Sequence, residues 1–182
     1  MGSRTREQVL DDAKRLHMLT PETIAALELT PIPNEVEVRE RLVDYKSRVN
    51  ALYDQIERWT AESGDGYAAR RSGVDYLFER YMAYWELPDE EVPLLSVYAP
   101  DGAEVLRFRP NGAWVTLTNG RVAIETPNTP PRRWRDLRLL DKSEEGQASQ
   151  WVLWGNRDSR LGSEPFNQET FIRLVKEKHE SL

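Results

Sequence analysis

The residues of this chain best suited to ligand chemistry form a short arginine-rich run around one tryptophan. Guanidinium forks bind phosphate oxygens, and an indole ring can stack on a nucleobase. The run 131–138 therefore predicts a site for a nucleotide or a single-stranded nucleic acid. The alternative interpretation is a solvated strand edge whose arginines pair with acidic residues of the first half of the chain. The candidate binding residues in this run are Arg132, Arg133, Trp134 and Arg135, with Arg138 at its end.

A second motif follows directly after this run. Asp141-x-Ser143-x-x-Gly146 resembles the second signature of the PilZ family of cyclic-dinucleotide receptors, and the resemblance implies such a ligand. The first signature of that family, Arg-x-x-x-Arg, has no counterpart in 131–138, where Arg133 and Arg138 stand one residue too far apart. The alternative interpretation is an ordinary turn built from Asp, Ser and Gly.

The chain offers few groups for nucleophilic or metal chemistry. It has no cysteine and only two histidines, His17 and His179. Disulfides, thiolate nucleophiles and cysteine zinc sites are excluded, and a histidine triad or multi-histidine metal centre is disfavoured. Carboxylate pairs such as Glu90/Glu91 could serve acid–base or hard-metal chemistry, but adjacent carboxylates in polar turns are usually solvated surface. We expect no cofactor and no metal.

Tryptophan is frequent, with six in the chain. Two of them, Trp151 and Trp154, belong to a predicted strand at 150–155, where their spacing places them on opposite faces. Most tryptophans in a chain of this size are expected to fill the core. One of this pair is expected to be exposed, where it could anchor a partner protein.

The clearest predicted element is a helix over 35–62, opened by the capping-box spacing of Asn34 and Glu37. Its apolar residues alternate by four and three positions, so they form one continuous stripe. The stripe could be an oligomer seam, a partner-binding face, or a face packed within its own domain. The large aromatic residues in it favour packing within the domain. The stripe comprises Val38, Leu42, Tyr45, Val49, Leu52, Ile56 and Trp59.

Other helices are predicted on both sides of this element. Thr5 and Thr20 begin two shorter helices before it. After a glycine-containing break at 63–66, the spacing of Ser72 and Asp75 opens another helix, which we expect to pack antiparallel against 35–62 as a long helical hairpin. The apolar face of that helix would be Val74, Leu77, Phe78, Tyr81, Tyr84 and Trp85.

Beyond residue 93 the apolar period changes to two, which predicts strands. We expect an antiparallel meander over 94–126, with tight turns at Asn111-Gly112 and Asn119-Gly120. Two further strands are predicted at 134–140 and 150–155, and Asn167 caps a last helix. The meander strands are predicted at 94–99, 105–109, 114–118 and 121–126.

The predicted fold class is thus α+β. The region 1–90 is helical, and 91–182 holds an antiparallel sheet plus a C-terminal helix; the two regions form either two domains or a single one. The net charge of −6 resides entirely in 1–90, because 91–182 is neutral. Polyanion binding depends on neutralising phosphates, so we expect no detectable binding of single-stranded DNA, RNA or cyclic dinucleotides at about 150 mM salt.

These observations favour a non-catalytic protein-binding module over an enzyme. Neither a secretory signal nor an apolar run long enough to span a membrane is present, so a soluble, cytoplasmic protein is expected. An acidic surface would steer association with a basic partner protein, as in an immunity-type inhibitor of a toxin or an adaptor. The first alternative is a nucleotide or single-stranded nucleic-acid binder using 132–138. The second is a carboxylate-based hydrolase. The oligomeric state is left open.

Overall fold

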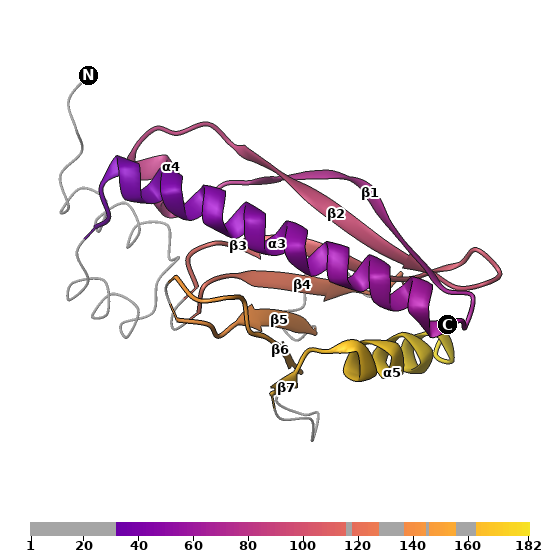
Figure 1. Ribbon diagram of the computed structural model, residues 1–182. Helices are drawn as coiled ribbons and strands as arrows, with labels where there is room; N and C mark the ends of the chain where they lie inside the picture. The colour runs from indigo at the N-terminus through magenta and orange to yellow at the C-terminus, as the bar shows by residue number, and fades with distance from the viewer. Residues whose placement is uncertain (1–31, 116–117, 128–136, 145, 156–162) are drawn as a thin grey trace.

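The computed structural model describes residues 32–115, 118–127, 137–144, 146–155 and 163–182. Within them α3 crosses one face of an antiparallel sheet, and α5 lies beside the C-terminal end of α3 (Figure 1). This arrangement confirms the predicted α+β class. The helices predicted to begin at Thr5 and Thr20 lie outside the described residues. The elements are α3 (Glu35–Ser63), β1 (Ala68–Leu77), α4 (Arg80–Tyr84), β2 (Glu90–Tyr98), β3 (Glu104–Gly112), β4 (Arg121–Glu125), β5 (Arg138–Asp141), β6 (Trp151–Trp154), β7 (Glu164–Pro165) and α5 (Gln168–His179).

The sheet is an antiparallel meander, as predicted, and is wider than the sequence indicates. In the described part of the chain seven strands pair in chain order, from β1 to β7. Leu95 pairs with Phe108, and Phe108 pairs with Ile124, so these side chains share one face. We call this the inner face, because it packs against α3 and α5. The opposite face is the outer face.

The predicted helical hairpin is wrong. Where a second helix was expected, residues 68–77 form β1, which pairs antiparallel with β2, and helical structure is limited to the five-residue α4. The physical reason is a long-range pairing that overrides the local apolar spacing. A register shift between Arg71 and Gly73 marks a bulge in β1, so the glycine serves an irregular strand rather than a helix.

The prediction of a tight turn at Asn111-Gly112 is also wrong. Gly112 belongs to β3 and pairs with Arg121, so the chain between β3 and β4 runs through 113–120. The strand predicted at 114–118 is absent from its described residues, which form only a bridge between Val115 and Thr118. Gly120 has φ +151°, and a Cβ there would lie 2.6 Å from the ring of Tyr45. This glycine therefore permits close approach of the loop to α3.

The long helix is confirmed. The side chain of Asn34 accepts a hydrogen bond from the Glu37 backbone N–H, and the Glu37 side chain accepts one from the Asn34 N–H. At the other end, Gly64 adopts the left-handed conformation that commonly ends a helix. This accounts for the glycine-containing break that follows α3.

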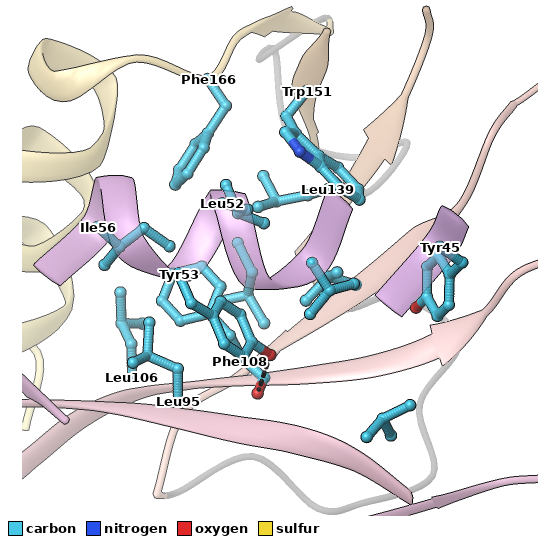
Figure 2. Packing of buried hydrophobic residues seen from close by; sticks show 14 of the residues in the cluster. Tyr45, Leu52, Tyr53, Ile56, Leu95, Leu106, Phe108, Leu139, Trp151 and Phe166 are labelled. Carbon is cyan, nitrogen blue, oxygen red and sulfur yellow. Dashed lines mark hydrogen bonds between the residues drawn. The ribbon is translucent and has the colours of Figure 1, made fainter. Parts of the chain in front are cut away.

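The apolar stripe of α3 packs within its own fold. Figure 2 shows Leu52 and Ile56 within a cluster of buried side chains that includes Phe108 and Leu139 from the sheet. The contact is mainly with the sheet, and a helix–helix contact is added near the C-terminal end, where the Trp59 and Phe171 rings lie 5.9 Å apart. The stripe is therefore neither an oligomer seam nor a partner-binding face.

Polar contacts fix the position of α3 on the sheet. The Tyr45 hydroxyl donates a hydrogen bond to the Arg121 carbonyl at 2.6 Å, and the Tyr53 hydroxyl donates one to the Phe108 carbonyl at 3.0 Å (Figure 2). Burial raises the pKa of both phenols well above their ordinary value, so both are neutral donors at physiological pH. These bonds set the register of the helix on the inner face.

The C-terminal strands and helix lie close to where the sequence predicts them. The described residues of the two further predicted strands form β5 and β6, and α5 begins after Asn167, whose side chain accepts a hydrogen bond from the Thr170 N–H. Phe171 and Phe166 pack edge to face with ring centroids 6.1 Å apart, which joins α5 to the core. The C-terminus consequently lies close to the C-terminal end of α3 (Figure 1).

Candidate protein-interaction surface

The strand β1 is an edge strand. Within the residues that the structure describes it pairs only with β2, and its other side carries no partner strand. Figure 1 shows it at the border of the sheet, beyond β2. The main-chain N–H and C=O groups on such a border can pair with an added strand. An extended segment of another protein can use them as a template.

The side chains at the end of β1 are apolar and exposed. Val74 is 52% exposed, Tyr76 60%, and Phe78, directly after the strand, 56%. Alternation along the strand places Val74 and Tyr76 on one face. Asp75 lies on the other face, where its carboxylate approaches the Arg109 guanidinium at 3.3 Å. A row of large exposed apolar side chains on an edge strand is a candidate interaction site.

A groove opens beside this part of β1. It is a cavity of about 340 Å³ between α3 and the segment leading into β2. Glu90, which lines it, pairs in register with Leu77 of β1 and forms a 2.9 Å ion pair with Lys46 of α3. Val43 projects here from α3 and is 69% exposed. The lining residues are Arg39, Leu42, Val43, Lys46, Leu87, Pro88 and Glu90.

Acidic residues lie next to this groove, whose own lining carries Arg39, Lys46 and Glu90. Glu86 and Asp89 are exposed on the chain between α4 and β2, and Glu91, exposed within β2, accepts a hydrogen bond from the Tyr76 hydroxyl at 3.5 Å. Arg71 of β1 is compensated, because its guanidinium pairs with Asp54 at 2.5 Å and lies near Glu57. The surface thus combines apolar side chains with negative charge. We call Val43, Val74, Tyr76, Phe78 and the acidic residues Glu86, Asp89 and Glu91 the edge surface.

The structure places the predicted tryptophan candidates on different sides. Trp151 is buried on the inner face, and no group of the described residues accepts a hydrogen bond from its indole N–H. Trp154 is 37% exposed on the outer face. It pairs directly with Arg138 of β5, the last arginine of the arginine-rich run. The other candidates, Arg132, Arg133, Trp134 and Arg135, lie outside the described residues, so their role stays a prediction.

The Asp141 motif has a structural role. Asp141 is fully buried, and its carboxylate accepts hydrogen bonds from the Ser143 and Gln150 N–H groups and from the Arg48 guanidinium at 3.1 Å. Burial opposes its charge, but these donors outweigh burial and hold the pKa of Asp141 below its ordinary value. The Ser143 hydroxyl also accepts from Arg48, at 2.9 Å. The motif thus anchors α3 to the end of β5.

The remaining candidates for chemistry are dispersed. His179 shares a 3.0 Å hydrogen bond with the Tyr67 hydroxyl, which ties the end of α5 to the start of β1. Over the described ranges no three His, Asp or Glu side chains gather as metal ligands. Glu90 pairs with Lys46, while Glu91 lies on the edge surface. None of the helices in the described part of the chain has the length and apolar character needed to cross a bilayer.

Comparisons of this chain with protein-family models, with curated proteins and with solved structures gave no match. Its candidate sites are therefore defined by their own residues. Sequence reasoning missed the edge surface, because β1 was predicted to be a helix. Two signals pointed to it: Gly73 inside the supposed helix, and the alternation of Val74, Tyr76 and Phe78.

Proposed function

We propose that this protein is a non-catalytic protein-binding module whose partner adds an extended segment to β1. The observation that carries the proposal is the edge surface, where a strand without a neighbour on one side displays Val74, Tyr76 and Phe78. Main-chain pairing supplies affinity in this mode of recognition, and pockets for alternate side chains supply specificity. The groove beside Glu90 is suited to receive such a side chain.

The chemistry of the edge surface favours one kind of segment. Its apolar row suits alternating apolar side chains, and Glu86, Asp89 and Glu91 complement Lys or Arg between them. A basic segment would also be steered toward the acidic first half of the chain. The partner we propose is therefore a protein with an exposed, basic and apolar extended segment. Inhibition of a basic toxin, as by an immunity protein, or adaptor binding are the roles that fit, and a cytoplasmic location stays a prediction.

The proposal is tested by comparing partner capture between matched variants. Purified full-length protein is cross-linked in lysate of its own host, and captured proteins are then remade and titrated individually. Val74→Lys with Tyr76→Lys introduces charges that guard an edge strand, and we expect affinity to fall about tenfold or more. Val36→Lys is the control, because Val36 is equally exposed, at 62%, but lies in the first turn of α3.

Hydrogen exchange provides the second measurement. Bound partner should slow exchange of the amides of 73–78 and leave the amides of the exposed residues 146–148 unchanged. A partner that binds the double variant as tightly as the wild type, or that leaves 73–78 unprotected, would show that the edge surface is not the binding site.

A further inference from the structure

The outer face of the sheet carries a second feature, independent of the edge surface. Strand pairing places Arg109, Ala123, Arg138 and Trp154 in one row across four strands, from β3 to β6. Arg121 pairs with Leu140 in the adjacent row of the same face and is therefore diagonal to Arg138. Side chains at diagonal positions are within reach of each other when they are long. Segments far apart in the chain thus bring Arg121, Arg138 and Trp154 close together, with Arg109 at the far end of the row.

Arg138 lacks a charge partner among the described residues. Its Nε is buried and makes no hydrogen bond. Other arginines of this face have acid partners: Arg107 pairs with Glu104 at 2.8 Å, and Arg109, whose Nε is likewise buried without a hydrogen bond, lies 3.3 Å from Asp75 and 3.4 Å from Glu125. A buried guanidinium N–H without an acceptor is costly, so an anionic oxygen placed there is stabilising.

Arg121 adds a second, oriented guanidinium. Asn111 accepts hydrogen bonds from its Nε at 2.9 Å and its Nη2 at 3.0 Å, which fixes the side chain. Burial lowers the pKa of Arg121, and the like charge of Arg138 lowers it further. Two guanidinium groups held near each other can form a site for an oxyanion.

Trp154 supplies a flat apolar surface beside this pair. It stands directly opposite Arg138 and is 37% exposed, and the neighbouring cross-strand pair consists of the buried Leu140 and the half-buried Val152. An exposed indole next to a phosphate-binding pair can stack with an aromatic ring of the same ligand. Phosphate binding by Arg138 and base stacking on Trp154 would thus take place at the two members of one cross-strand pair.

We propose that the outer face binds a mononucleotide, with its phosphate between Arg121 and Arg138 and its base on Trp154. A single phosphate requires only a local positive site, which a chain of net charge −6 can provide. A polymer would instead meet the repulsion of the whole molecule. The proposal is independent of partner binding at β1.

Titration calorimetry of the full-length protein tests the site with four probes: AMP, adenosine, inorganic phosphate and an oligothymidylate of eight nucleotides. We expect AMP to bind, and adenosine and phosphate alone each to bind about tenfold or more weakly. Arg138→Met should weaken AMP binding by about tenfold to a hundredfold through lost charged hydrogen bonds. Trp154→Ala should weaken AMP binding by about fivefold or more and leave phosphate binding unchanged.

Arg107→Met is the matched control, because Arg107 is an arginine of the same face that is already paired with Glu104; AMP affinity should change less than about twofold. Absence of AMP binding at millimolar concentration would overturn the proposal, as would AMP affinity unchanged in Arg138→Met. If the oligothymidylate binds more than about tenfold tighter than AMP, the ligand is a single strand and the mononucleotide assignment is wrong.

Discussion

The two faces of the sheet differ in the polar partners that they provide for an arginine side chain. Arg48 reaches the inner face from α3 and is enclosed by Asp44 at 2.7 Å, Asp141 at 3.1 Å and the Ser143 hydroxyl. Arg138, on the outer face, has a buried Nε without an acceptor. The difference is that the fold itself supplies the acids for Arg48, whereas our proposal assigns the partner of Arg138 to a ligand.

The surroundings of the two arginines explain the contrast. Asp44 and Asp141 hold the pKa of Arg48 above its ordinary value, although burial acts in the opposite direction. On the outer face the side chain diagonal to Arg138 is another arginine, Arg121, whose pKa is lowered by burial and by that neighbour. The inner site therefore surrounds its arginine with two acids, whereas the outer site places two arginines near each other.

The largest effect is expected from Arg48→Met. The substitution keeps the length of the side chain but leaves the Asp141 carboxylate buried without its cation, which costs about 3–5 kcal/mol. Denaturant unfolding monitored by tryptophan fluorescence measures this change. A loss below about 1 kcal/mol would mean that the Arg48–Asp141 pair is not an anchor of α3.

Leu52→Ala tests the apolar part of the inner face. Leu52 is buried in the core, so truncation should cost about 2–5 kcal/mol in the free energy of unfolding. Val43→Ala is the control on the same helix, because Val43 is exposed, and its change should stay within about 0.5 kcal/mol. Equal effects of the two substitutions would contradict the assignment of the stripe to the core.

The acid dependence of stability tests Asp141 separately. Its pKa is lowered in the folded state, so its contribution is complete above the unfolded-state pKa of about 4 and is lost as pH falls through the folded value. Asp141→Asn keeps the shape of the side chain and cannot titrate. The difference in unfolding free energy between wild type and variant should therefore shrink below about pH 4. A constant difference down to pH values near 2 would show that Asp141 does not hold this charge.

Much of the inner face could be predicted, because its signals are local. The spacing from Val38 to Trp59 and the capping pair Asn34–Glu37 specify α3 without knowledge of the rest of the chain. Asn167 specifies the start of α5 in the same way. These features depend on residues three or four positions apart, which sequence shows directly.

The candidate sites depend on contacts that a local pattern does not contain. The spacing of Ser72 and Asp75 favours a helix, and only pairing with β2 makes this segment a strand. Arg121, Arg138 and Trp154 become neighbours through strand register, which one residue of slippage would change. The sequence identified the arginine-rich run and Trp154 as separate candidates. It did not show that Arg138, the last arginine of the run, and Trp154 are cross-strand neighbours.

The smallest effect on stability is expected from Arg138→Met, the same substitution made on the outer face. Methionine preserves the apolar stem and removes a buried N–H without an acceptor together with the repulsion of Arg121. Unfolding free energy should therefore change by less than about 0.5 kcal/mol, or rise slightly, in contrast to Arg48→Met. The measurement is a denaturant melt at low and high salt, where the relief of repulsion should be greater at low salt. A loss of more than about 2 kcal/mol would place Arg138 among the structural arginines and remove the contrast between the two faces.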